Sequence, residues 1–139
     1  MQRLRKSLQI FVVEDDEDDI LIFSETCKDF GFLNVHFFDT VHALTRYAHS
    51  SGTTPELILL DLGQVIHGRA EMLVELTSDA LLTTVPIVFV SGSKTFGESM
   101  KHQYPHLKID RFLEKPITIE ALEGQLRPLD HLFEAELQH

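Results

Sequence analysis

Five short runs of apolar residues recur along the chain, and most are continuous instead of alternating with polar positions. Runs of this length that are apolar throughout are typical of strands buried on both faces, as in a parallel sheet. Many of their residues are β-branched or aromatic, the types that favour strands. The pattern predicts five buried strands, at 8–13, 35–38, 57–60, 87–90 and 109–113.

Two segments with helical spacing follow the first two runs. The first should end at Gly31, because glycine adopts the left-handed conformation that often terminates a helix. The second should be capped by Asp39 or Thr40, whose side chains can accept a hydrogen bond from the first turn. The apolar stripes are Ile20, Phe23, Cys27 and Phe30 in the first helix and Val41, Leu44 and Ala48 in the second. Cys27 is therefore predicted to be an inert, buried thiol.

Three further helices are predicted in the second half of the chain. One spans 70–82, and a weakly apolar one at 94–104 is stopped by Pro105. Thr118 should cap the last, and Pro128 should kink or break it. The inward residues are predicted to be Leu73, Leu76 and Ala80 in the first of these, and Ile119, Leu122 and Leu126 in the last.

The predicted order is therefore a strand followed by a helix, five times over. Right-handed crossovers between parallel strands turn this order into an α/β fold: an open, doubly wound, five-stranded parallel sheet with helices on both faces. A chain of 139 residues fits one such domain, 1–139, with an expected core of 8–126 and a C-terminal extension, 127–139. Ligands of such sheets bind at the carboxyl ends of the strands.

Composition narrows the classes of partner. The net charge is −10, and six consecutive acids occupy 14–19. Such a protein repels phosphate backbones and anionic lipid, so neither a nucleic acid nor a membrane is an expected partner. Cys27 is the single cysteine, so no internal disulfide can form. Because the apolar stretch after the basic N-terminus is too short for a signal peptide, we expect a cytoplasmic protein.

The strand ends carry the candidate chemistry. Glu14 and Asp15 follow the first predicted strand, Asp61 the third, Ser91 the fourth and Lys115 the fifth. Clustered carboxylates repel one another unless a cation joins them, and hard oxygen ligands favour magnesium over zinc. A carboxylate can also accept a phosphoryl group. The arrangement predicts a magnesium-dependent phosphoryl-transfer site in which an ammonium and a hydroxyl bind phosphoryl oxygens.

Four motifs carry a family resemblance. In order, FVVEDDEDD, LILLDLG, VFVSGS and FLEKP resemble the receiver domain of two-component response regulators, over residues 8 to about 126. The resemblance implies the flavodoxin-like strand order 2-1-3-4-5 and a Mg2+ ion. It also implies a signalling switch in a phosphorelay. A sensor histidine kinase or phosphotransfer protein is expected to phosphorylate the switch, and a downstream protein target is expected to bind it according to its phosphorylation state. The surface expected to bind this target comprises the fourth helix, the fifth strand and the fifth helix.

The resemblance also assigns roles to individual residues. Asp61 is the expected phosphoacceptor, and Asp61 with the acid pair Glu14 and Asp15 and the backbone carbonyl of Gly63 is expected to hold the metal. Ser91 and Lys115 are expected to bind the phosphoryl group, Phe112 to change position with phosphorylation state, and the Lys115–Pro116 bond to be cis. The later acids Asp16, Asp18 and Asp19 are expected to face solvent.

Some features leave alternatives open. Six acids in a row allow Asp16 to replace Glu14 or Asp15 in the pair. Receivers usually carry a proline where this chain has Val65, and the loop to Gly68 is one residue short. These changes, with the missing side chain at Gly63, affect the loop over the site and the lifetime of the phosphoryl group.

Three other functions compete with the switch. The main alternative is a receiver-like interaction module that works without phosphorylation. A magnesium phosphohydrolase is disfavoured because such sites need a second acid where Gly63 stands, and a nucleotide or flavin binder because no glycine-rich loop follows the first strand. The chain is therefore expected to be no enzyme, but a phosphoacceptor that assists its own phosphotransfer and dephosphorylation.

Overall fold

A computed structural model of the chain describes residues 2–64, 71–105 and 109–135, and it contains one parallel sheet. The strand order is β2-β1-β3-β4-β5, which confirms the predicted doubly wound sheet and its flavodoxin-like order. The strands are β1 (Gln9–Val13), β2 (Asn34–Phe38), β3 (Leu57–Asp61), β4 (Ile87–Ser91) and β5 (Phe112–Glu114). The helices are α1 (Glu17–Phe30), α2 (Val41–Ser51), α3 (Glu71–Ser78), α4 (Lys94–Gln103) and α5 (Ile119–Leu126). The 3-10 turns that lie wholly within the described residues include η1 (Leu62–Gln64) and η3 (Asp130–Leu132).

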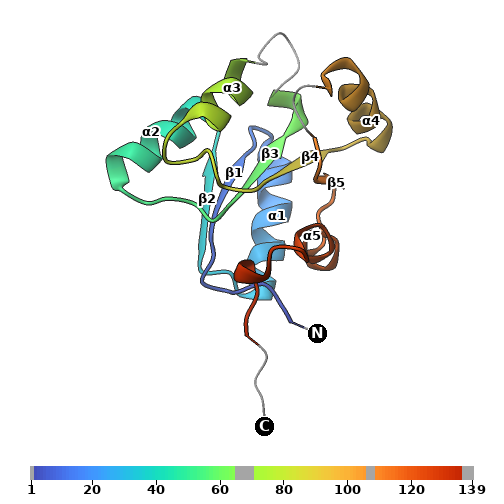
Figure 1. Cartoon of the computed structure of the whole chain (residues 1–139). Helices are drawn as coiled ribbons and strands as arrows, with labels where there is room; N and C mark the ends of the chain where they lie inside the picture. The colour runs from blue at the N-terminus through green and yellow to red at the C-terminus, as the bar shows by residue number, and fades with distance from the viewer. Residues whose placement is uncertain (1, 65–70, 106–108, 136–139) are drawn as a thin grey trace.

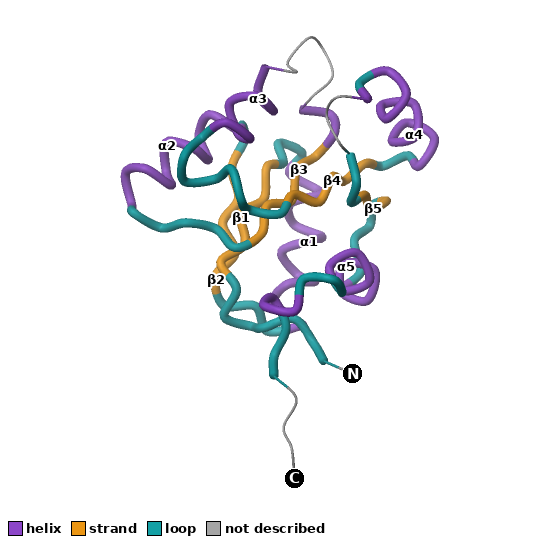
Figure 2. The backbone as a smooth tube through the Cα atoms, viewed as in Figure 1, coloured by secondary structure: helices purple, strands orange, loops and turns teal. Residues whose placement is uncertain are grey.

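The helices cover both faces of the sheet, and each face has its own apolar core (Figures 1 and 2). On one face, α1 and α5 pack over alternate strand residues such as Val12 and Leu59. On the other face, α2, α3 and α4 pack over the intervening residues, such as Phe11 and Leu60. Since both sides of the central strands are buried, these strands are apolar at nearly every position.

The predicted helix ends are mostly as expected. Gly31 follows α1 with a φ of 100°, the left-handed conformation that favours glycine. Thr40, and not Asp39, caps α2 by accepting a hydrogen bond from Ala43, and Thr118 caps α5 in the same way. Cys27 is buried as predicted, and this burial raises the pKa of its thiol to about 12.

Two predictions from the apolar pattern were wrong. The fifth strand is Phe112–Glu114 and not 109–113, because Ile109 is buried in the core beside α3 and α4 without joining the sheet. The third helix ends at Ser78 and not at residue 82, so Ala80 lies beyond it and is exposed. Val65 and Gly68 lie outside the described residues.

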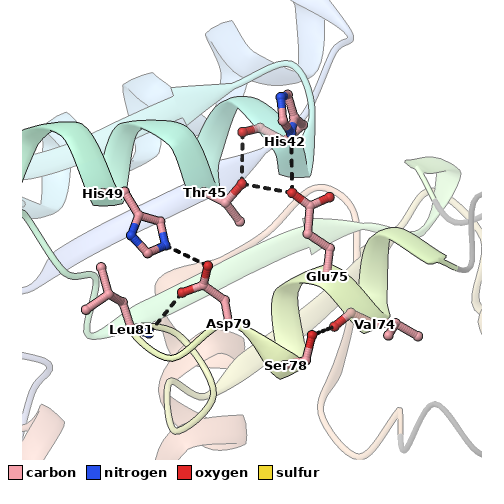
Figure 3. Close-up of polar contacts among 8 residues, drawn as sticks. All are labelled: His42, Thr45, His49, Val74, Glu75, Ser78, Asp79 and Leu81. Carbon is pink, nitrogen blue, oxygen red and sulfur yellow. Dashed lines mark hydrogen bonds and ion pairs between the residues drawn. The ribbon is translucent and has the colours of Figure 1, made fainter.

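Helices α2 and α3 lie side by side and are joined by polar contacts (Figure 3). His49 and Asp79 form a pair with 2.7 Å between Nε2 and Oδ2. One turn away, Glu75 accepts a hydrogen bond from Thr45 at 3.0 Å and lies 3.3 Å from His42. These contacts fix α3 against α2.

The segments before β1 and after α5 are also part of the fold. Leu4 forms an antiparallel bridge with Phe133, and both residues are buried, as is Leu132. The buried carboxylate of Glu123 on α5 accepts hydrogen bonds from the Leu4 amide and the Arg3 guanidinium, both at 2.9 Å. The core therefore extends beyond the expected limits of 8–126. Among the described residues, no helix is both long and apolar enough to cross a bilayer.

Candidate phosphoryl-transfer site

Three carboxylates meet at the carboxyl edge of the sheet. Ligand oxygens of Glu14, Asp15 and Asp61 all lie within 4.8 Å of one another. Glu14 is buried, Asp61 is half-buried and Asp15 is exposed. This gradient from interior to solvent follows from the chain path, since β1 ends inside the sheet and Asp16 then caps α1 by accepting a hydrogen bond from the Asp19 amide.

The donor set suits a hard dication. The Oε2 atom of Glu14 is buried and has no hydrogen-bond partner among the described residues. A buried carboxylate oxygen without a partner is costly unless a cation or donor completes it. Burial raises the pKa of Glu14 to about 7, against the opposing hydrogen bond from Lys115. Glu14, Asp15 and Asp61 therefore fit the Mg2+ expected from the sequence.

Gly63 lies beside the expected acceptor, within η1. A Cβ atom at this position would stand only 2.7 Å from Oδ2 of Asp61. Real Cβ atoms do not approach this closely, so the present position of the Asp61 carboxylate depends on a glycine here.

Lys115 lies at the centre of the acidic cluster. Its ammonium group forms ion pairs with Glu14, with Asp19 at 2.7 Å and with Asp61 at 3.1 Å. Partial burial opposes charge on Lys115, yet these carboxylates together raise its pKa above the ordinary value. The lysine is therefore held fully charged next to the Asp61 oxygens. Its bond to Pro116 is cis, as predicted.

Asp19 belongs to this cluster, although it was expected to face solvent. It is half-buried, and the hydrogen bond from Lys115 lowers the pKa of its carboxyl. Asp16 and Asp18 are exposed, as predicted. The available sequence signal was the spacing Asp16-x-x-Asp19, because an N-cap fixes the residue three positions later on the first turn.

Ser91 and Phe112 lie on the α4 side of the site. Ser91 is buried, and its hydroxyl accepts a hydrogen bond from the Ser93 amide at 3.1 Å and donates one to the Ser93 carbonyl at 3.2 Å. Phe112 is half-buried with its ring against Gly97 of α4, where an added Cβ would lie 2.5 Å from two ring carbons.

A cavity of about 250 Å³ opens beside the cluster and extends under α1. Its polar end is formed by Glu14, Asp19, Asp61 and Lys115, and its deeper walls are mostly apolar. The cavity thus opens next to Glu14, Asp61 and Lys115, whereas Asp15 lies outside its lining.

Several solved structures share this fold. The bacteriophytochrome response regulator AtBRR superposes with a TM-score of 0.76 at 20% identity, over 96% of this chain and 99% of that one. A two-component response regulator from Legionella pneumophila gives 0.71 at 22% identity, over 90% and 99% of the two chains.

A third neighbour contains a metal ion. The receiver domain of a sensor histidine kinase from Pseudomonas aeruginosa gives a TM-score of 0.69 at 17% identity, over 87% of this chain and 96% of that one, and has a magnesium ion coordinated in its active site cleft. No protein-family model matches the chain, and no curated protein matches it in sequence.

The superpositions show that the chain has the fold of a response regulator receiver domain over nearly its whole length.

Proposed function

We propose that this protein is a phosphorylation-dependent switch of a two-component phosphorelay, with Asp61 as the phosphoacceptor. The observation that carries the proposal is the placement of Asp61 in a receiver fold. Its carboxylate lies within ligand distance of Glu14 and Asp15 and 3.1 Å from the Lys115 ammonium. The proposed acceptor, the acids proposed to bind the metal and the ammonium proposed to bind the phosphoryl group thus lie together at one edge of the sheet.

The chemistry assigned to Asp61 is nucleophilic. One of its oxygens attacks phosphorus while the bond to the donor breaks, which is a P–N bond in a phosphohistidine and a P–O bond in acetyl phosphate. A phosphohistidine whose second ring nitrogen carries a proton leaves as neutral imidazole, acetyl phosphate leaves as acetate, and an aspartyl phosphate remains. Glu14, Asp15, Asp61 and the Gly63 carbonyl would hold a Mg2+ ion, which would supply positive charge against the transferring phosphoryl group.

Two further side chains act on the product. Lys115 pairs with a phosphoryl oxygen, since it is already charged and adjacent to Asp61. Ser91 donates its hydroxyl to another oxygen after giving up its bond to Ser93. Phe112, whose ring packs against Gly97, then changes position. This change alters the surface of α4, β5 and α5 to which a protein partner binds. The partner, the cytoplasmic location and the absence of a separate enzymatic activity remain predictions.

Intact-mass measurement after incubation with acetyl phosphate and magnesium tests the proposal. We expect one added phosphate on the wild type, none in EDTA and none on Asp61→Asn. Asp29→Asn, an exposed residue of α1, is the matched control and should be phosphorylated normally. An unmodified wild type would favour the alternative, an interaction module that works without phosphorylation, whereas acid-stable, hydroxylamine-sensitive phosphate on Asp61→Asn would move the acceptor elsewhere.

A further inference from the structure

One hydrogen bond ties the start of α4 to the end of β5. The backbone amide of Lys94, the first residue of α4, donates to Oε2 of Glu114 at 2.9 Å. The first amides of a helix have no acceptor within the helix, and a carboxylate is favoured there by the helix dipole. Ser93 satisfies a second amide, that of Phe96, at 3.2 Å. Glu114 is therefore an additional cap supplied from a neighbouring strand.

This cap lies next to the residues that bind the phosphoryl group. Glu114 directly precedes Lys115, whose backbone amide donates to the Ser91 carbonyl at 2.8 Å. The loop from Ser91 to Lys94 is thus attached to the end of β5 at both of its ends. Between these attachments, the Ser91 hydroxyl is occupied by the backbone of Ser93.

We propose that Glu114 is a positioning residue that holds this loop in its resting conformation and so opposes phosphorylation of Asp61. The inference rests on the proposed function. For Ser91 to donate to a phosphoryl oxygen, its hydroxyl must give up its bonds to the carbonyl and amide of Ser93, and the proposal requires that the loop moves with it. The Lys94 amide, three residues further along, then moves relative to β5. A bond made only in the resting state shifts the equilibrium toward that state.

The size of the effect follows from the position of the bond. Glu114 is exposed, so water competes with the Lys94 amide for its carboxylate. Such a bond contributes a modest net free energy, equivalent to a shift of roughly threefold to tenfold in a two-state equilibrium.

Two substitutions remove the same bond from opposite ends. Glu114→Ala removes the acceptor, and Lys94→Pro removes the donor. Proline is tolerated as the first residue of a helix. Ser93 has φ −137° and ψ 122°, the extended conformation that a residue before proline adopts. Lys94→Ala is the matched control, because it changes the side chain and keeps the amide.

The primary readout is the affinity for beryllofluoride with magnesium, a mimic of the phosphoryl group on the acceptor carboxylate. We expect Glu114→Ala and Lys94→Pro each to bind about threefold to tenfold more tightly than the wild type. The double variant should gain no more than either single one, because both remove one interaction. Lys94→Ala should match the wild type. Additive single effects, or equal effects of Lys94→Ala and Lys94→Pro, would overturn the proposal.

A second readout requires no phosphoryl mimic. Hydrogen exchange of the Lys94 amide should be several-fold faster in Glu114→Ala than in the wild type, and unchanged exchange would mean that the bond is absent in solution. Failure of the proposed function can be distinguished from failure of the role proposed for Glu114. A wild type that binds no beryllofluoride overturns the proposed function together with this role of Glu114. A wild type that binds it, with Glu114→Ala binding equally well, overturns this role alone.

Discussion

The carboxylate of Asp19 and the ammonium group of Lys115 lie 2.7 Å apart, so an acid on α1 holds the lysine that faces the candidate phosphoacceptor. A phosphoryl group on Asp61 would compete with Asp19 for the same ammonium. Asp19 also places a negative charge near the one that phosphorylation adds. Both effects disfavour the phosphorylated state.

We therefore predict that Asp19→Asn tightens beryllofluoride binding. The expected gain is about threefold to tenfold, since a unit charge at about 4 Å contributes on the order of 1 kcal/mol in a water-like medium. Titration in the presence of magnesium measures it. Asp18→Asn is the matched control, because it makes the same change in net charge on an exposed residue of the same turn. Equal gains in both variants would show that overall charge, and not the contact with Lys115, is responsible.

A second prediction concerns the acid pair. Removing Asp15 should weaken magnesium binding more than removing Asp16, Asp18 or Asp19. Of these four described residues, only Asp15 belongs to the set of three carboxylates, with Glu14 and Asp61, whose ligand oxygens lie within 4.8 Å of one another. Asp16→Ala should instead lower stability by about 0.5–2 kcal/mol through loss of the α1 cap. Calorimetric titration with Mg2+ and chemical unfolding separate the two effects, and Asp16→Ser should restore the cap. Asp16→Ala as the most damaging change to magnesium affinity would move the pair by one residue.

The lifetime of the phosphoryl group gives a third prediction. Gly63 has no side chain to orient an attacking water and Ser93 is short, so we expect slow decay. Gly63→Asn supplies an amide and should shorten the lifetime. Any side chain at Gly63 must also displace the Asp61 carboxylate, since a Cβ would stand 2.7 Å from Oδ2.

Gly63→Ala therefore serves as the control for displacement alone. Phosphate loss should be followed after removal of the donor. Faster decay in Gly63→Asn than in Gly63→Ala supports water orientation by the amide. If Gly63→Asn and Ser93→Glu both decay like the wild type, local water positioning does not set the rate.

The pair of His49 on α2 with Asp79, directly after α3, predicts a pH dependence of stability. The hydrogen bond with His49 lowers the pKa of Asp79 below its ordinary value. Between the folded and unfolded pKa values, the unfolded chain binds more protons at Asp79 than the folded protein does. The stabilisation is therefore complete above the unfolded value, near pH 4, and is lost as the pH falls through the folded value.

Urea unfolding from neutral to acidic pH measures this contribution. The difference in free energy of unfolding between the wild type and Asp79→Asn should be constant above about pH 4 and shrink below it. The asparagine side chain of this variant would still offer an acceptor to the Leu81 amide, which the present carboxylate binds at 2.9 Å. Asp29→Asn, at an exposed position, should show no such trend. A difference that grows on acidification would contradict the assignment.

The apolar pattern predicted the sheet well because burial on both faces leaves a strong signal in β1, β3 and β4. It failed at the fifth strand, where a buried residue does not pair with the sheet. Ile109 is buried outside any strand, so a prediction from apolarity alone made the fifth strand too long. The contact of Asp19 with Lys115 joins residues 96 positions apart in the sequence, so local spacing could place Asp19 on its turn but not supply its partner. The same holds for Glu114 and the Lys94 amide, which meet only after β5 pairs with β4.

The bridge between Leu4 and Phe133 has a practical consequence for spectroscopy. The two ends of the described chain leave the molecule next to each other (Figure 1), near the start of β3, where Arg5 also pairs with Glu56. The candidate site lies at the opposite ends of the strands. A donor and an acceptor dye attached near residues 2 and 135 would therefore stay close together whatever the state of Asp61. Energy transfer between them would follow unfolding, whereas a dye pair meant to follow signalling needs one partner on α4.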